Sequence, residues 1–218
     1  MNKAVIFDLD GTVIDSLKDI AENVNLMLFH YGYKTLSEEE VKRIIGNGAR
    51  RVVKDALLSV GVKPTEKELE EGVRYYNEKY NSCASLYTKP FDGISEVIKE
   101  LSGRGYKIAI LSNKPQTTAD LVCSIYLKDI KIDKIIGERD GVKCKPDKTA
   151  TLSILKEFDV LPENCYFVGD GETDVLTSLN AETNGIAVLW GNRTKEQLVK
   201  AGAKVFAEKP SDLLKLIP

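Results

Sequence analysis

Residues 4–12 read AVIFDLDGT, in which four apolar residues lead into two acids and a glycine. An uninterrupted apolar run of this length is typical of a strand buried on both faces of a parallel sheet. Because side chains alternate along an extended chain, Asp8 and Asp10 would point to the same side. Two carboxylates aimed at one point repel each other unless a cation or a shared proton lies between them. The stretch therefore predicts an acidic site at a strand end, although aspartate and glycine also occur there as ordinary turn formers.

In the rest of the chain, the spacing of the apolar residues changes twice. Residues 15–82 show helical spacing of apolar residues, with capping boxes at 37–40 and 65–68 that start two helices. Beyond residue 91, short apolar runs alternate with helical stretches, at 108–111, 135–136, 166–168, 186–189 and 205–206. That alternation predicts right-handed βαβ units and a parallel sheet.

These patterns predict the α/β fold class, with a doubly wound, parallel-sheet (Rossmann-like) core domain and a small all-helical cap domain. The core would comprise residues 1–14 and 86–218, and the cap would comprise residues 15–85. We expect linkers near 14–16 and 85–90, where the chain would pass between the two parts.

Composition excludes several classes of protein. The 218 residues are 43% hydrophobic and 29% charged, which is typical of a globular chain, and no apolar run approaches the roughly 18 residues of a membrane span. The net charge is −2 and no basic block stands out, so we expect neither a membrane nor a nucleic acid as partner. The first residues lack the apolar region of a signal peptide, which predicts a cytoplasmic location.

The chemistry must come from carboxylates and lysines. The chain has one histidine, so histidine-ligated metals and serine-histidine triads have almost no basis. Its four cysteines are widely spaced and include no C-x-x-C pair, which argues against a zinc site and predicts reduced, mostly buried thiols.

Three further polar motifs lie near predicted strand ends. Ser112-Asn113-Lys114-Pro115 follows the strand at 108–111, Lys143-Cys144-Lys145-Pro146-Asp147 precedes a helix, and Gly169-Asp170-Gly171-Glu172-Thr173-Asp174 follows the strand at 166–168. Each has an ordinary interpretation: a helix cap at Ser112 or Asn113, a surface lysine, and acids at a helix start. We expect helices to begin at both prolines. Because active sites of open α/β sheets lie beyond the carboxyl ends of the strands, all four motifs are expected to meet there.

Together the motifs resemble those of the haloacid dehalogenase-like hydrolase superfamily of aspartate-nucleophile phosphatases. They read D-x-D-G-T at 8–12, S-N-K at 112–114, K-P at 145–146 and G-D-x-x-x-D at 169–174. The resemblance covers essentially the whole chain, and the helical insert looks like that family's cap. Residues 13–16, 45–50 and 113–115 look most like phosphoglycolate phosphatases.

The resemblance implies a role for each acid. Mg²⁺ would be held by the Asp8 carboxylate, the Asp10 backbone carbonyl and Asp170, and Asp174 would be the outer acid that orients a metal-bound water or the lysine. Asp8 would be the nucleophile that forms an aspartyl phosphate. Asp10 would protonate the leaving alcohol and then accept a proton from water.

The substrate contacts follow in the same way. Ser112, the Asn113 amide and Lys145 would bind phosphate oxygens, and Thr12 of the first motif would also bind the substrate. Arg50, in the cap loop GNGAR, would face a substrate carboxylate, unless it is a solvated arginine in a glycine-rich connector.

The leading hypothesis is a Mg²⁺-dependent phosphatase of a small phosphorylated, phosphoglycolate-like metabolite, working as a monomer or homodimer. A phosphosugar mutase with the same aspartyl-phosphate chemistry and a non-catalytic binding module on this fold are the alternatives. A haloacid dehalogenase is disfavoured, because it has no use for Asp10.

Overall fold

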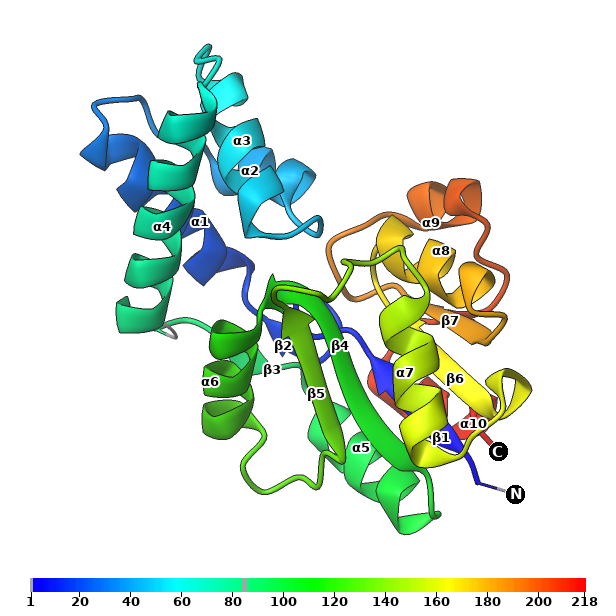
Figure 1. The fold of residues 1–218 in the computed structure, drawn as a ribbon. Coiled ribbons are helices and arrows are strands. Elements are labelled where there is room, and N and C mark those ends of the chain that lie inside the picture. The colour runs from blue at the N-terminus through cyan, green and yellow to red at the C-terminus, as the bar shows by residue number, and fades with distance from the viewer. Residues whose placement is uncertain (1, 84–85) are drawn as a thin grey trace.

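Six parallel strands form the main sheet of the computed structural model, which describes residues 2–83 and 86–218 (Figure 1). The strands lie in the order β5-β4-β1-β6-β7-β8, so β1 is near the middle. The predicted α/β fold class is confirmed. The bounds of the strands are β1 Ala4–Phe7, β4 Lys107–Pro115, β5 Lys134–Glu138, β6 Cys165–Gly169, β7 Asn184–Val188 and β8 Phe206–Ala207.

Both faces of this sheet are covered, which explains the uninterrupted apolar run at its centre. Every residue of β1 is fully buried. Val5 and Phe7 belong to one hydrophobic cluster, with α5, α6 and α10, whereas Ala4 and Ile6 belong to another, with α7. Helices α8 and α9 pack beside β7. The bounds of these helices are α5 Ile94–Gly103, α6 Gln116–Tyr126, α7 Thr149–Phe158, α8 Glu172–Asn180, α9 Lys195–Ala201 and α10 Leu213–Leu216, and the single 3₁₀ turns are Pro162–Asn164 and Pro210–Asp212.

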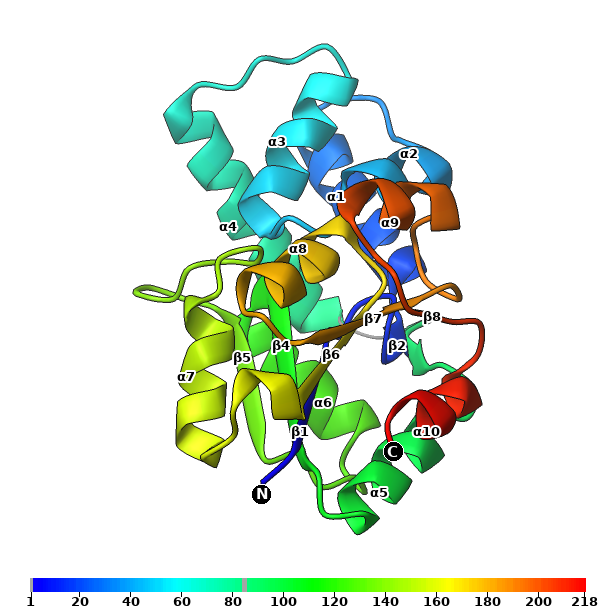
Figure 2. The ribbon, with the colours of Figure 1, turned by 90° about the vertical axis from the view of Figure 1, so that its right-hand side faces the viewer.

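Four helices form a bundle beyond one end of the sheet (Figures 1 and 2). They are α1 Leu17–His30, α2 Glu38–Ile44, α3 Ala49–Ser59 and α4 Glu66–Cys83. They enclose a hydrophobic cluster of their own, whose fully buried members include Val24, Met27, Leu28 and Val53. Both predicted capping boxes are present, so α2 and α4 begin where the sequence indicates.

The two connections between this bundle and the sheet pair with each other. Strand β2 (Ile14–Asp15) runs antiparallel to β3 (Lys89–Pro90). Asp19 of α1 is buried and fixes the returning chain, because its carboxylate accepts hydrogen bonds from the backbone N–H (2.7 Å) and hydroxyl (2.5 Å) of Thr88. The sequence predicted plain linkers here, since two-residue strands leave no readable pattern. The part of that prediction that falls on residues 84 and 85, like the core assignment of residue 1, lies outside the described residues.

The two helices expected to begin at proline begin later. Strand β4 continues through Ser112 and Asn113 to Pro115, so neither polar residue caps a helix, and α6 begins at Gln116. After Pro146 the chain first makes a turn, in which the Asp147 carboxylate accepts a hydrogen bond from the Thr149 N–H at 2.8 Å. Only then does α7 begin. Both motifs are therefore free to face the end of the sheet.

Candidate active site

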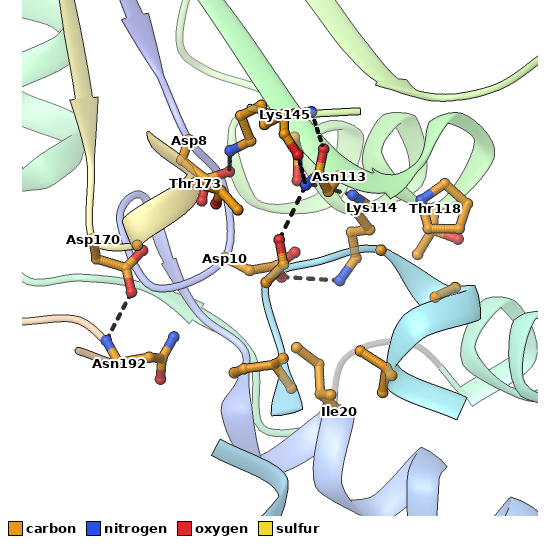
Figure 3. Close-up of a pocket in the computed structure, with 18 of the residues that line it drawn as sticks. Asp8, Asp10, Ile20, Asn113, Lys114, Thr118, Lys145, Asp170, Thr173 and Asn192 are labelled. Atoms are coloured by element: carbon orange, nitrogen blue, oxygen red, sulfur yellow. Dashed lines mark hydrogen bonds and ion pairs between the residues drawn. The ribbon is translucent and has the colours of Figure 1, made fainter. Parts of the chain in front are cut away.

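A pocket lies between the carboxyl ends of β1, β4 and β6 and the helical bundle (Figure 3). Its space is about 740 Å³, including solvent at the mouth. Charged and polar side chains from the sheet line one side, and mostly apolar side chains from the bundle line the other. The sheet side includes Asp8, Asp10, Ser112, Asn113, Lys114, Lys145, Asp170 and Asp174, and the bundle side includes Ile20, Ile45, Val52, Tyr76 and Tyr80.

Lys145 lies at the centre of the acidic part of this pocket. Its Nζ is 2.7 Å from Asp8 Oδ1 and 2.6 Å from Asp174 Oδ1, and its side chain is 1% exposed. Burial alone would lower the pKa of Lys145, but the carboxylates of Asp174 and Asp8 outweigh burial and raise this pKa above its ordinary value. The lysine is therefore a fixed cation beside Asp8.

Three carboxylates share this small space. Ligand oxygens of Asp8, Asp170 and Asp174 all lie within 4.8 Å of one another. Burial, and then the charge of Asp174, raises the pKa of Asp8 to about 7, although Lys145 opposes the shift. Burial and the charge of Asp8 likewise raise the pKa of Asp170 to about 6. The three carboxylates are crowded, and the positive charge beside them is too small to neutralise all three when they are ionised. Such a cluster of oxygen donors suits a hard divalent cation such as Mg²⁺.

The two acids beyond β6 are held differently. Asp170 accepts hydrogen bonds from the Thr12 hydroxyl at 3.0 Å and the Asn192 N–H at 2.7 Å. Asp174 uses Oδ1 for Lys145 and Oδ2 for the Gly171 N–H at 2.9 Å. Both oxygens of Asp174 are thus engaged within the protein, which suits the predicted outer acid.

Gly11 lets the first motif fold back against Asp170. Its φ is +87°, and a Cβ atom at this position would lie 2.4 Å from Asp170 Oδ2. Any side chain would both strain the backbone and displace the carboxylate. The glycine of the D-x-D-G-T motif is therefore required by the close approach of two motifs that are far apart in the sequence.

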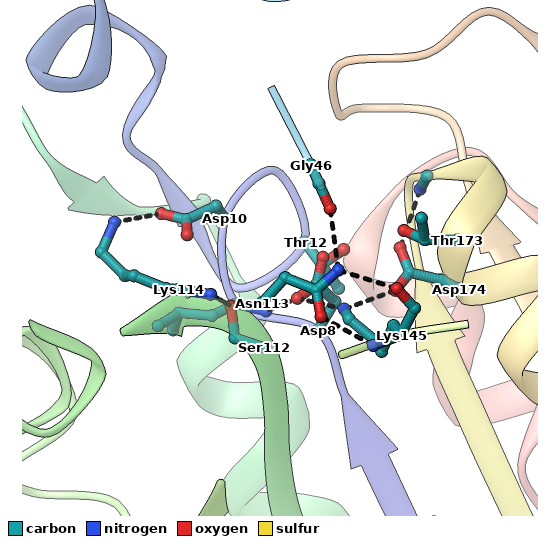
Figure 4. A network of polar contacts seen from close by, with 12 residues as sticks. Asp8, Asp10, Thr12, Gly46, Ser112, Asn113, Lys114, Lys145, Thr173 and Asp174 are labelled. Atoms are coloured by element: carbon teal, nitrogen blue, oxygen red, sulfur yellow. Dashed lines mark hydrogen bonds and ion pairs between the residues drawn. The ribbon is translucent and has the colours of Figure 1, made fainter. Parts of the chain in front are cut away.

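A second lysine of the site belongs to the S-N-K motif, but the sequence predicted no role for it. Lys114 is 8% exposed, and its Nζ lies 2.9 Å from Asp10 Oδ1 (Figure 4). The same Nζ lies 2.9 Å from the Tyr80 hydroxyl. Asp10 also accepts a 2.5 Å hydrogen bond from Ser16 Oγ. Its position at the end of β4 was the available signal for Lys114, whereas nothing in the sequence predicted Tyr80.

Asn113 holds three segments together. Its side-chain N–H groups donate to the backbone carbonyls of Gly46 and Lys145, each at 3.1 Å, and its Oδ1 accepts from the Lys145 N–H at 2.8 Å. Ser112 Oγ accepts from the Lys114 N–H at 3.2 Å. The side-chain amide of Asn113 thus positions Lys145 and the loop after α2.

The structure does not bring Thr12 and Arg50 into the pocket. Thr12 is fully buried beneath Asp170, so it orients that carboxylate. The Arg50 side chain is 45% exposed, its guanidinium pairs with Glu66, and Arg50 does not line the pocket. Contact of Arg50 with a substrate would require this ion pair to open.

Arg193, for which no sequence pattern predicted a role, joins the sheet domain to the bundle. It follows β7, and its two Nη atoms donate to the backbone carbonyls of Lys42 (2.8 Å) and Ile45 (2.7 Å) at the carboxyl end of α2. Its Nε donates to Glu172 at 2.9 Å. Carbonyls at the carboxyl end of a helix lack hydrogen-bond partners within the helix, and the guanidinium supplies these partners. Its positive charge also interacts favourably with the negative end of the helix dipole.

The family described as haloacid dehalogenase-like hydrolase matches residues 5–188, a range that contains all four motifs. The chain belongs to this family. The chain is similar to a phosphoglycolate phosphatase of Aquifex aeolicus, which is 30% identical over 218 residues that cover 99% of this chain and 96% of the relative. Phosphoglycolate phosphatase 1 of Pseudomonas aeruginosa is also 30% identical, over 97% of this chain and 78% of the relative.

Solved structures share the architecture. A candidate phosphoglycolate phosphatase from Lactobacillus delbrueckii subsp. bulgaricus superposes with a TM-score of 0.90 at 30% identity, over 100% of this chain and 99% of the other. A candidate β-phosphoglucomutase from Bacteroides vulgatus, at 23% identity and a TM-score of 0.77 over 98% of this chain and 86% of the other, shows the fold alone. The family match and the relatives at 30% identity make the protein a phosphoric monoester hydrolase of this family. Among the described residues, no helix is long and apolar enough to cross a membrane.

Replacing Asp8 with Asn is expected to stabilise the metal-free protein at pH 8. An acid whose pKa is raised on folding costs stability as the pH rises from 3.8 to about 7, because the native protein then holds a proton that the unfolded chain has released. Asn keeps the size of the side chain and removes the charge, so we expect a gain on the order of 1–3 kcal/mol at pH 8 that shrinks toward pH 4. Urea unfolding in EDTA measures this gain, and equal stability of both proteins at pH 8 would contradict it.

Replacing Arg193 with Ala is expected to loosen the end of α2 and the loop after it. The carbonyls of Lys42 and Ile45 lose their partner, so hydrogen exchange of the helical amides of residues 41–44 should accelerate by roughly tenfold or more, while exchange in β1 stays unchanged. Arg51→Ala is the matched control, because the Arg51 side chain is 58% exposed and pairs within its own helix, with Asp55. Equal acceleration in both variants would show that Arg193 has no special part in holding the loop.

Proposed function

We propose that this hydrolase is a Mg²⁺-dependent phosphatase that cleaves a small, phosphoglycolate-like phosphate ester through an aspartyl-phosphate intermediate. The observation that carries the proposal is the contact of Lys145 with both Asp8 and Asp174, beside the three-carboxylate cluster. A carboxylate beside a fixed cation, at the open end of a parallel sheet, suits nucleophilic attack on an anionic phosphate.

Asp8 is the proposed nucleophile. Its Oδ1 is occupied by Lys145 and by the Leu9 N–H at 2.7 Å, so these contacts fix the orientation of the carboxylate. Its other oxygen would then be available for in-line attack on phosphorus. Lys145 neutralises charge that develops on the transferred group, and Ser112 lines the same pocket within reach of that group.

The residues that would hold Mg²⁺ are Asp8, the Asp10 backbone carbonyl and Asp170. When bound, Mg²⁺ supplies the positive charge that lets a carboxylate approach a phosphate dianion. Thr12 and the Asn192 N–H keep Asp170 turned toward the site. Asp174 would orient Lys145 and a water molecule in the coordination shell.

Asp10 is the proposed acid and base for the leaving group. It lines the pocket together with Asp8, but it contacts Ser16 and Lys114, away from the Asp8–Lys145 pair. This separation supports two different tasks for two carboxylates of one motif. Asp10 would protonate the departing alcohol and then accept a proton from the water that attacks the aspartyl phosphate.

The division into a core and a cap is part of the same proposal. Residues 1–14 and 86–218 would supply the chemistry, and the bundle within 15–85 would supply substrate specificity. Its separate hydrophobic cluster and the apolar side chains that it places over the pocket support this division.

A mutase remains the second candidate, because the candidate β-phosphoglucomutase shares the fold. It is less well supported, because the relatives at 30% identity are named phosphoglycolate phosphatases. A non-catalytic module is disfavoured by the complete set of Asp8, Asp10, Lys145 and Asp170. A cytoplasmic location and a monomeric or homodimeric state stay predictions, testable by cell fractionation and by light scattering.

Metal removal provides the first test. With excess EDTA, release of phosphate from phosphoglycolate should fall below about 1% of the rate with Mg²⁺, and adding Mg²⁺ should restore it, because uncompensated carboxylates would repel the substrate. A phosphate-release assay without any bisphosphate activator also separates a phosphatase from a mutase. Full turnover in EDTA would overturn the metal requirement.

Amide variants separate the tasks of the two acids. Asp10→Asn should slow release of phosphate from an alkyl phosphate by roughly 10²–10⁴-fold, because it removes the proton donor and base. With an aryl phosphate, whose leaving group hardly needs protonation, a phosphoryl group should accumulate on Asp8 and add its mass to the intact protein. Asp8→Asn is the matched control and should gain no mass. A phosphoryl group on the control, or on another residue, would contradict the assignment of the nucleophile.

A further inference from the structure

The pocket contains two buried lysines that face two different carboxylates of the first motif. Lys145 contacts Asp8, at the proposed phosphoryl end, whereas Lys114 contacts Asp10, at the proposed leaving-group end. Figure 4 shows the two pairs apart from each other, with Asn113 between them. The phosphatase chemistry proposed above gives a task to Lys145 and none to Lys114.

The ammonium of Lys114 has room for a further partner. It has three N–H donors, and within the described part of the chain two acceptors are found for them, Asp10 Oδ1 and the Tyr80 hydroxyl. The Nζ atom also lies 4.2 Å from the centre of the Tyr80 ring. Because Lys114 and Tyr80 both line the pocket, the remaining N–H is available to a ligand there.

The surroundings make this ammonium selective for an anion. The Lys114 side chain is 5% exposed, and a buried ammonium without a carboxylate partner is strongly unfavourable. A ligand carboxylate can share Lys114 with Asp10, or replace Asp10 there, without leaving the lysine unpaired. A neutral alkyl group in the same place forms no hydrogen bond or ion pair with the lysine.

The pocket limits the size of the ligand. Asp8, Asp10 and Lys114 line the same pocket, whose space is about 740 Å³ including solvent at the mouth. The bundle lines its other side with Ile20, Val52 and Tyr76. A group that reaches from Asp8 to Lys114 within this pocket is therefore small.

Resting on the proposed phosphatase function, we propose that Lys114 and Tyr80 form a subsite for a carboxylate on the leaving group. The substrate class would then be the phosphate esters of short hydroxy acids. Tyr80 belongs to α4, so the subsite is complete only when the bundle lies over the sheet. This assignment places carboxylate recognition at Lys114, in contrast to Arg50, whose guanidinium is exposed and paired with Glu66.

Two matched pairs of ligands test the subsite. Phosphoglycolate and ethyl phosphate differ by the carboxylate and are compared by kcat/KM. The non-hydrolysed 3-phosphonopropionate and propylphosphonate differ in the same way and are compared by calorimetric affinity in the presence of Mg²⁺. The proteins are the full-length wild type, Lys114→Met, Tyr80→Phe and the control Lys131→Met, which changes a 71% exposed lysine.

The wild type should prefer the carboxylate-bearing member of each pair by about 10–100-fold, as expected for a hydrogen bond to a buried charge. Lys114→Met should reduce both preferences to less than about threefold. Loss of catalysis common to both esters cancels in the ratio, so a general effect of exposing Asp10 does not imitate this result. Tyr80→Phe should reduce each preference by about two- to tenfold, and Lys131→Met should leave both unchanged.

Absence of a preference in the wild type, or an unchanged preference in Lys114→Met, would overturn the subsite. If circular dichroism shows that Lys114→Met is unfolded, Tyr80→Phe decides, and an unchanged preference in that variant overturns the proposal. Failure of the phosphatase proposal looks different. The wild type would release no phosphate from either ester with Mg²⁺, while the phosphonate pair would still report on Lys114 and Tyr80.

Discussion

Repulsion among buried carboxylates is the constraint on which this site depends. Asp8, Asp170 and Asp174 face one another, Asp8 half-buried and the other two buried, and one lysine cannot compensate three negative charges. The fold tolerates this arrangement because Asp8 and Asp170 directly follow β1 and β6, and Asp174 lies in the first turn of α8. Hydrogen bonds from Thr12, Asn192 and Gly171 hold two of them in place. Such stored repulsion is typical of sites that bind a cation and an anionic substrate together, and its cost falls on the stability of the empty protein.

The three cations of the site have different partners. Lys145 is committed to Asp8 and Asp174, Lys114 to Asp10 and Tyr80, and Arg193 to the end of α2. Each cation is positioned by a carboxylate partner, so none has to be ordered when a ligand arrives. The pocket is therefore preorganised toward negative charge at two points, and Arg193 keeps the bundle close to both of them.

Much of this could be predicted from the sequence because the signals were local. The apolar run at 4–7 and the polar residues that follow each strand predict both the sheet and the edge at which the motifs meet. Contacts that depend on tertiary structure could not be predicted. Nothing near Arg193 indicates that its guanidinium reaches α2, and only the packing of α4 over the pocket brings Tyr80 to Lys114. Thr12 illustrates the same limit, since a motif residue expected near the substrate lies behind Asp170.

The pairing of β2 with β3 has a consequence for how such a protein can change. The chain leaves the sheet and returns to it at adjacent points, and these points are hydrogen-bonded to each other. The helical bundle between β2 and β3 is therefore an insertion whose two ends lie side by side. Its length and shape can vary without altering the register of β1 against its neighbours, and so without moving Asp8. The architecture thus separates a sheet end, whose geometry stays fixed, from an inserted bundle, whose length and shape can change.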